Sequence, residues 1–552
     1  MGQSDLLVLP VLLPLVTAAI LLALGDRRRN FKAGLTLVSV LAALGLAGYL
    51  MASIDRGDTA GAFAVYLPGN WPVPFGIALA LDRVSALMLV LSACTALAAL
   101  LFSLARWHRA SVHFHPLLQL QLMGLNGAFL TADLFNLFVF FEVMLAASYS
   151  LLLHGGGVTR VRPGLHYVAI NLVASLLFLI GVALLYGIAG TLNMADLAQK
   201  LPLVPPGDRG LLHAAAALLA VAFLAKAALW PLNFWLPTAY AAASAPSAAV
   251  FAMLTKVGVY AVLRLWTLCF PPDAGASAHF GGPVLVWGGL ATVAFGAVGM
   301  LASRQLGRLA GYSVIATSGT LVAAIGLDRP ELTAAALFYL ASSTLAAAAL
   351  FLLAELVERP RQVEVDPPSP DDRDGRLPAF GDTAAIDQAA LRDDVNLDDR
   401  QQALVGRAMP AALATVAFSF LVCLLVLAGL PPFSGFVGKL AMLMALLQER
   451  AAAAWLLFGL LIVSGLCAAV GLLRAFIAHL WAPQGRPAPL VRVVEMTPVL
   501  LLLAACTALA VAGEPVLRYT RAAAAQLHAP EHYVQSIMNA RPLPPPAQTA
   551  AP

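Results

Sequence analysis

The chain has 552 residues, of which 61% are hydrophobic and 11% are charged, and its formal net charge is +4. A soluble domain carries about 25% charged residues. This composition therefore excludes a soluble globular protein and predicts one that crosses a membrane many times, and the small positive charge gives no indication of nucleic-acid binding.

A bilayer core about 30 Å thick needs about 20 apolar residues per helix, and by that rule the chain contains about fourteen spans. The alternating pattern of barrel strands is absent, which leaves helices as the spanning elements. We therefore predict an all-α polytopic membrane protein. The spans are expected near 5–24, 34–52, 80–104, 116–131, 133–153, 165–188, 212–230, 243–268, 283–302, 308–326, 332–356, 411–429 with a continuation to 447, 453–477 and 494–513.

Basic residues are concentrated in the loops that follow odd-numbered spans. The intervening loops are poor in them: 271–282 has none and 327–331 has one. Because positive charge favours the cytoplasmic side, both termini are predicted to lie outside the cytoplasm. The basic residues concerned are Arg27, Arg28, Arg29, Lys32, Arg106, Arg109, Arg160, Arg162, Arg304, Arg308, Arg486 and Arg492.

One long hydrophilic insert, 358–410, joins spans 11 and 12. It is rich in Asp, Arg and Pro and has little periodicity, so we expect an irregular cytoplasmic loop. The five cysteines are scattered with no CxxC pair, which argues against iron–sulfur and zinc sites. No P-loop or Rossmann fingerprint occurs. We therefore expect no cofactor, no metal site and no enzymatic activity of the chain itself.

The charges inside the apolar spans are few and of an unusual kind. Glu142 is the one acid at mid-span depth, and it is accompanied by three of the five lysines, Lys226, Lys256 and Lys439. Each unpaired charge costs at least about 2.5 kcal/mol on insertion scales. A static ion pair would account for Glu142 and one lysine, but it does not account for three lysines against one acid.

The use of lysine at these depths indicates a chemistry. Arginine stays protonated in proteins, whereas a buried lysine can lose its proton. The chain has arginine in most of its loops and lysine at the three deep positions. This distribution is typical of a proton relay and is not expected of a scaffold.

Two of the deep lysines lie beside helix breakers. Lys226 precedes Pro231, and Lys439 follows Pro431 and Pro432. Proline frees backbone carbonyls, which membrane proteins tolerate where the backbone is buried in protein or lines a wet cavity. If spans 4–8 and 9–13 are two units, the fourth helix of each is broken, and the odd number of helices makes the repeats inverted. Inverted repeats with broken helices are typical of ion pathways in transporters.

The chain is thus predicted to have four parts. They are 1–110, the first three spans; 111–270, the first five-helix repeat; 271–480, the second repeat, which includes the hydrophilic loop; and 481–552, the last span and a C-terminal tail.

Three stretches make the chain similar to a known family, the antiporter-like subunits shared by Mrp-type (Pha-type) cation/proton antiporters and respiratory complex I. The stretches are "ADLFNLFVFFEVML" around Glu142, "AKAALWPLNFWLPTAYAAASAPSAAVFAMLTKVGVYAVLR" around Lys226 and Lys256, and "GLPPFSGFVGKLAML" around Lys439. The resemblance extends over nearly the whole chain, and it is greatest to the D-subunit branch of the family.

The resemblance implies a role for each deep charge. Glu142 matches the family's helix-5 glutamate, and Lys226 matches the helix-7 lysine that is paired with it. Lys256 matches the helix-8 lysine, and Lys439 matches the helix-12 residue. In the family these positions form a proton relay along the membrane midplane, between two half-channels.

The chain also departs from the family pattern. Thr317 stands where many relatives carry a histidine, and span 11 lacks the histidine and lysine that some relatives have there. Passage between Lys256 and Lys439 would then use hydroxyl groups or water. The supporting residues that we expect are Asp133, Pro231, Thr317, Ser342, Ser343, Thr344, Pro431 and Pro432.

The function implied by the resemblance is that of a proton-translocating membrane subunit of a multisubunit Na⁺ or K⁺/H⁺ antiporter, which serves pH and cation homeostasis. Its expected partners are the other membrane subunits of the complex, the lipid bilayer, H⁺ and either Na⁺ or K⁺. The alternative is a proton-pumping subunit of an oxidoreductase of the complex I or membrane-bound hydrogenase type. A purely structural scaffold is disfavoured by the three deep lysines.

Overall fold

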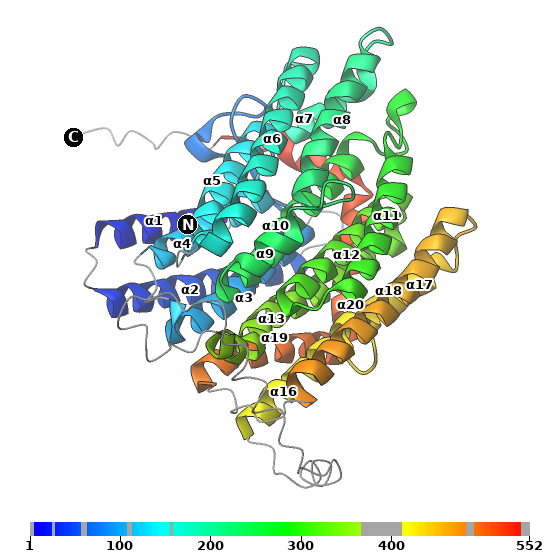
Figure 1. Ribbon diagram of the computed structural model, residues 1–552. Helices are drawn as coiled ribbons and strands as arrows, with labels where there is room; N and C mark the ends of the chain where they lie inside the picture. The colour runs from blue at the N-terminus through cyan, green and yellow to red at the C-terminus, as the bar shows by residue number, and fades with distance from the viewer. Residues whose placement is uncertain are drawn as a thin grey trace, which may run out of the picture.

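The computed structural model describes residues 5–24, 28–56, 63–107, 113–154, 158–365, 411–481 and 491–542. Most of this part of the chain is helical. The long helices form one bundle, with α1 and α2 at one side and α17 and α18 at the other (Figure 1). The all-α prediction is therefore confirmed.

Among the described residues, thirteen helices are long and apolar enough to cross a membrane, and they correspond to thirteen of the fourteen predicted spans. The fourteenth, α4, is also a helix, with 17 residues. The helices of the first half are α1 (Leu9–Ala23), α2 (Arg29–Asp55), α3 (Arg83–Ala105), α4 (Phe114–Leu130), α5 (Leu134–Leu152), α6 (Val158–Ala189), α7 (Met194–Lys200), α8 (Arg209–Lys226), α9 (Leu236–Ala242) and α10 (Ala245–Cys269).

The second half of the described chain is also mainly helical. It comprises α11 (Gly282–Ala302), α12 (Leu306–Leu327), α13 (Pro330–Val365), α16 (Ala411–Ala428), α17 (Ser434–Leu446), α18 (Ala452–Phe476), α19 (Val493–Val511), α20 (Gly513–Leu527) and α21 (Pro530–Met538). A small hairpin, β1 (Ala64–Tyr66) with β2 (Leu79–Leu81), precedes α3. Helix α13 continues to Val365, past the predicted start of the loop 358–410, and residues 366–410 lie outside the described residues.

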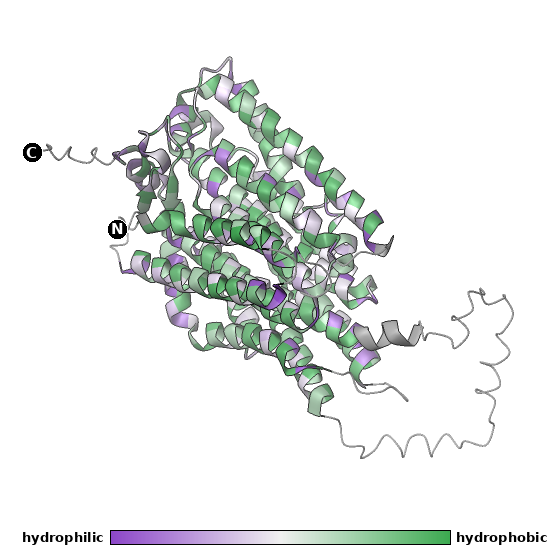
Figure 2. Ribbon diagram, turned by 90° about the vertical axis from the view of Figure 1, so that its left-hand side faces the viewer, coloured by the Kyte–Doolittle hydropathy of each residue, from purple (hydrophilic) through white to green (hydrophobic). Residues whose placement is uncertain are grey.

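The core of the bundle is formed by α10 and α13. Every residue in the most apolar window of these two helices is buried, whereas only 33% of the corresponding window of α2 is buried. Hydrophobic residues predominate along the helices on the outside of the bundle as well (Figure 2). An apolar exterior of this extent is what a bilayer requires, since lipid replaces water around the spans.

The first two helices of each predicted repeat, α4 with α5 and α11 with α12, pack in the same way. In both pairs, two glycines let the neighbouring helix approach so closely that an added Cβ would lie less than 3.0 Å from it. The contacts are Gly124 with Met144 and Gly127 with Phe140 in one pair, and Gly296 with Ala316 and Gly299 with Tyr312 in the other. One shift along the sequence maps the first set onto the second, which supports the predicted repeat.

The interruptions predicted in spans 7 and 12 are both present. Helix α8 ends at Lys226 before α9 begins at Leu236, and α16 ends at Ala428 before α17 begins at Ser434. Just after the C-terminal ends of α8 and α16, one residue has a left-handed backbone conformation, and a backbone hydrogen bond of 2.9 Å closes the turn around it. This is the geometry of a helix C-cap. The bonds run from Leu229 N to Leu224 O across Ala228 (φ 56°) and from Leu430 N to Leu425 O across Gly429 (φ 77°). The orientation of the two units relative to each other in the membrane stays a prediction.

The predicted C-terminal tail contains two further helices, α20 and α21, that pack against the ends of α3 and α10. Tyr519 Oη donates to the backbone carbonyl of Arg83 at 2.8 Å, and the ring of Tyr533 lies 5.0 Å from the Arg264 guanidinium. Arg264 in turn forms an ion pair with Asp82 at 2.6 Å, and both side chains are buried. Asp82 also caps α3 by accepting a hydrogen bond from Ser85 N at 2.8 Å. Its second role as the partner of a buried arginine was not predicted.

We expect Arg264→Met to lower the free energy of unfolding by about 3–5 kcal/mol, because it leaves the Asp82 carboxylate buried without its charged partner. The double variant Asp82→Leu/Arg264→Met should regain much of the lost stability, because no buried charge is left without its partner. It should remain about 1 kcal/mol less stable on account of the missing helix cap. The measurement is the thermal unfolding midpoint of the purified protein.

The matched control is Arg329→Met, which removes an ion pair to Glu449 at 2.8 Å in which the arginine is 58% exposed and the glutamate 21% exposed. Ion pairs near the surface contribute about 0–1 kcal/mol, so this variant should unfold close to the parent. An Arg264→Met midpoint no lower than that of Arg329→Met would show that the buried pair does not stabilise the fold.

Candidate functional site

The deep charged residues are carried by α5, α8, α10 and α17, which follow one another across the bundle (Figure 1). The three lysines are buried, with exposed fractions of 5% for Lys226, 1% for Lys256 and 7% for Lys439, and Glu142 is half-buried. The hydrogen bonds of these residues form three separate clusters.

The first cluster joins α5, α6 and α8. Ser175 Oγ donates a short hydrogen bond to Glu142 Oε1, and Lys226 Nζ donates to Ser175 Oγ at 3.3 Å. The Lys226 amine also lies 5.1 Å from the centre of the Phe141 ring, a cation–π arrangement. Within the described part of the chain no ion pair of 4.0 Å or less joins Glu142 to Lys226 directly. The resemblance implied a Glu142–Lys226 pair, and the structure connects the two through a serine that the sequence did not single out.

The second cluster joins α10 to α12. Lys256 Nζ donates to Thr317 Oγ1 at 2.8 Å and lies 3.4 Å from Ser318 Oγ. Thr317 Oγ1 donates its own proton to the Val314 carbonyl at 2.8 Å, so its lone pairs are free to accept from the amine. The structure thus places Thr317, the residue at the family's histidine position, directly on Lys256.

The third cluster lies at the second helix break. Lys439 Nζ donates to the carbonyl of Ala428 at 2.9 Å and lies 3.4 Å from that of Leu427. These are carbonyls at the end of α16, which have no partner in their own helix because α16 stops there. Next to this break Ser342 Oγ and Ser434 Oγ are 2.7 Å apart, so a hydroxyl pair links α13 to α17.

The other predicted supporting residues have local roles. Ser343 and Thr344 both donate to the Leu340 carbonyl in their own helix, at 3.3 and 2.7 Å. Asp133 caps α5 by accepting a hydrogen bond from Asn136 N at 2.8 Å. Three prolines are exposed on the outside of the bundle, namely Pro231, Pro431 and Pro432.

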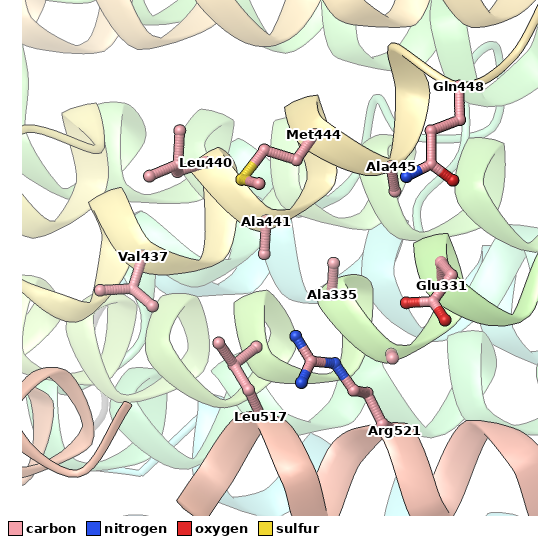
Figure 3. A pocket seen from close by; sticks show the side chains of 11 residues that line it. Glu331, Ala335, Val437, Leu440, Ala441, Met444, Ala445, Gln448, Leu517 and Arg521 are labelled. Atoms are coloured by element: carbon pink, nitrogen blue, oxygen red, sulfur yellow. The ribbon is translucent and has the colours of Figure 1, made fainter. Parts of the chain in front are cut away.

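Among the described residues, no hydrogen bond connects one cluster to the next. Nor does the described part contain a group of three or more His, Cys, Asp or Glu side chains that could hold a metal ion. A pocket of about 270 Å³ lies between α13, α17 and α20, with Glu331, Gln448 and Arg521 as the polar side chains among apolar walls (Figure 3). None of the four deep charged residues lines this pocket, so it is not part of the predicted site.

Gly465 of α18 packs against the third cluster, and replacing it is expected to disrupt the break. A Cβ at this position would lie 2.6 Å from the Ala428 carbonyl oxygen and 3.0 Å from Lys439 Nζ. We expect Gly465→Ala to lower the free energy of unfolding by about 1–3 kcal/mol, because the backbone of the break must move to make room. The measurement is the thermal unfolding midpoint.

Gly459→Ala is a matched control in the same helix, since nothing lies within 4 Å of a Cβ built there. Alanine is the better helix former, so this variant should be as stable as the parent or more stable by about 0.5–1 kcal/mol. Equal midpoints for the two variants would contradict the close packing at Gly465.

The chain is similar to known proteins along its whole length. Residues 131–366 match a family described as "NADH:quinone oxidoreductase/Mrp antiporter, TM". The chain is 50% identical to the D subunit of a probable K⁺/H⁺ antiporter of Rhizobium meliloti, over 97% of this chain and 98% of that protein. It is 32% identical to the D subunit of an Na⁺/H⁺ antiporter of Alkalihalophilus pseudofirmus, over 97% of this chain and 100% of that protein.

A solved structure also has the same fold. A chain in the structure of the Mrp complex from Dietzia sp. superposes with a TM-score of 0.78 at 26% identity, covering 98% of this chain and 100% of that one.

Proposed function

The chain belongs to the family of antiporter D subunits, and from that premise we propose that it translocates protons as a membrane subunit of a multisubunit K⁺ or Na⁺/H⁺ antiporter. The observation that carries the proposal is the end-to-end similarity to the Rhizobium meliloti protein. The other membrane subunits of such a complex are its partners. The relative at 50% identity is named for K⁺ and the one at 32% for Na⁺, which favours K⁺ as the exchanged cation.

We propose that the three clusters are the proton-carrying parts of this subunit. Each contains a buried lysine whose amine donates to an uncharged oxygen, from a hydroxyl or a backbone carbonyl. Such a partner accepts a hydrogen bond without fixing a positive charge as a carboxylate would, so the amine remains able to give up its proton. Glu142 is the one acid in the clusters, and its negative charge favours the protonated form of Lys226 when the two are close.

We further propose that the two units, spans 4–8 and 9–13, form two half-channels. The matched glycine contacts and the matched caps at the two breaks support a repeated architecture. Between Lys256 and Lys439 the proton would pass over Thr317 and the Ser342–Ser434 hydroxyl pair, with water completing the path. The contact of Thr317 with Lys256 supports the first step of this route.

The test is exchange in inverted membrane vesicles that contain the complete complex. A pH-sensitive dye reports proton release when KCl or NaCl is added, and vesicles from cells that lack only this chain serve as the control. The proposal requires that the added cation cause proton release and that this release disappear when the chain is absent. If K⁺ is the preferred cation, proton release should be larger with KCl than with NaCl. A fully assembled complex that exchanges neither cation for protons would overturn it.

The alternative, a proton-pumping subunit of an oxidoreductase, is favoured by one observation, the family description that names both classes. The composition of the purified complex separates the two, because an oxidoreductase would contain flavin or iron–sulfur proteins. Finding only membrane subunits without redox groups would support the antiporter.

We also propose that the chain lies in a bacterial inner membrane with both termini outside the cytoplasm, as the distribution of arginine predicts. An alkaline phosphatase fused to the C-terminus should then be active, since this enzyme folds only outside the cytoplasm. An inactive fusion with an intact complex would reverse the assigned orientation.

A further inference from the structure

Ser175 of α6 lies between the two charged groups of the first cluster. Its side chain is buried, with 6% exposed. The hydroxyl donates its one proton to Glu142 Oε1 and accepts a hydrogen bond from Lys226 Nζ. A hydroxyl has one donor and two acceptor positions, so it can take a proton on one side while it gives its own proton on the other.

We propose that Ser175 is the bridge through which a proton passes between Lys226 and Glu142, an inference that rests on the proposed function of this cluster. In the transfer an N–H bond of the Lys226 ammonium breaks and its proton joins Ser175 Oγ. At the same time the original Ser175 proton moves to Glu142 Oε1. The lysine becomes a neutral amine, the glutamate becomes a carboxylic acid, the serine is unchanged, and no further reactant is consumed. The reverse transfer restores the two charges.

The surroundings of Lys226 support this route over a direct transfer. The face of the Phe141 ring lies near the amine, and an aromatic ring has no site that can take up and pass on a proton. Among the described residues the one hydrogen-bond partner of the Lys226 amine is the Ser175 hydroxyl. The same hydroxyl is also the one described hydrogen-bond partner of the Glu142 carboxylate. The two charged groups therefore meet at a single oxygen.

Three substitutions at this position separate a bridge from a packing role. Ser175→Ala removes the hydroxyl and keeps the Cβ, and we expect exchange in inverted vesicles to fall by about tenfold to a hundredfold, the range for a lost hydrogen bond to a charged group. Ser175→Thr keeps a hydroxyl and should retain most of the exchange. Ser175→Gly leaves room for a water molecule that can take the place of the hydroxyl, so its activity should lie above that of the alanine variant.

A packing role predicts the opposite order, because glycine inside a helix is less favourable than alanine. Exchange that is as fast in Ser175→Ala as in the parent, or faster in Ser175→Ala than in Ser175→Gly, would overturn the bridge. If the threonine variant fails to assemble on native gels, the alanine–glycine order still decides. The matched control is Thr95→Val in α3. The Thr95 hydroxyl is buried, and its partners among the described residues are the Leu91 and Ser92 carbonyls of its own helix, so exchange by this variant should match that of the parent.

The outcome for Ser175 can be told apart from the outcome for the proposed function. If Glu142→Gln and Lys226→Ala abolish exchange while Ser175→Ala matches the parent, the bridge is wrong and the relay stands. If assembled Glu142→Gln exchanges normally, the relay itself is wrong whatever Ser175→Ala does.

Discussion

An assembled complex that carries Glu142→Gln is expected to show no cation/proton exchange. The amide is nearly the same size as the carboxyl group, and its oxygen can still accept the Ser175 hydrogen bond. Packing between α5 and α6 should therefore survive. The variant loses the negative charge that favours a protonated Lys226, together with the one carboxylate of the three clusters, which can itself take up a proton. The measurement is dye-reported exchange in inverted vesicles, with assembly checked on native gels.

The matched control is Glu331→Gln, which neutralises an exposed glutamate in the pocket between α13, α17 and α20. That residue belongs to none of the three clusters, so exchange should match the parent. Normal exchange in assembled Glu142→Gln would remove Glu142 from the mechanism. A loss in both variants would point to a general sensitivity to charge and would not single out Glu142.

Lys226→Arg is expected to be as inactive as Lys226→Ala. Arginine stays protonated in proteins, so it could replace a lysine that serves only as a fixed positive partner but not one that must release a proton. Its guanidinium also carries five donors, and the structure offers one hydroxyl and the face of a phenyl ring at this position. We expect the complex with this variant to assemble and to show no cation/proton exchange in the vesicle assay.

The width of the guanidinium is a confounding factor, and parallel changes at Lys256 and Lys439 control for it. The partners differ between the sites, with two hydroxyls at Lys256 and two backbone carbonyls at Lys439. If arginine variants lose exchange only because the guanidinium is too wide, the loss should differ between the sites and the thermal unfolding midpoint should fall. If they lose exchange because arginine does not release a proton, the variants at all three sites should be inactive, with unfolding midpoints near that of the parent. Robust exchange by assembled Lys226→Arg would leave a structural role for this lysine.

The sequence predicted those features that a local pattern encodes. Apolar stretches long enough to cross a bilayer predicted the positions of the spans, and prolines within them predicted both helix interruptions. The rarity of lysine drew attention to three residues that the structure buries. Thr317 was expected to assist Lys256 because it replaces a histidine of the family, and the two side chains are in contact at 2.8 Å.

Contacts between distant segments could not be predicted in this way. Ser175 is one serine in an ordinary apolar span, and nothing in its neighbourhood along the chain indicates that it faces both Glu142 and Lys226. The same holds for Arg264 and Asp82, which lie far apart in the sequence. The helices α20 and α21 were missed because they are too polar to count as spans, although their pattern of apolar residues is that of helices lying on a surface.

The glycine contacts of α4 with α5 and of α11 with α12 also determine how the molecule can change its shape. Backbones that approach this closely leave no space for one helix to slide or roll over the other. Each pair is therefore expected to move as one rigid body. We therefore expect relative motion to occur between these pairs and other helices, and not within either pair.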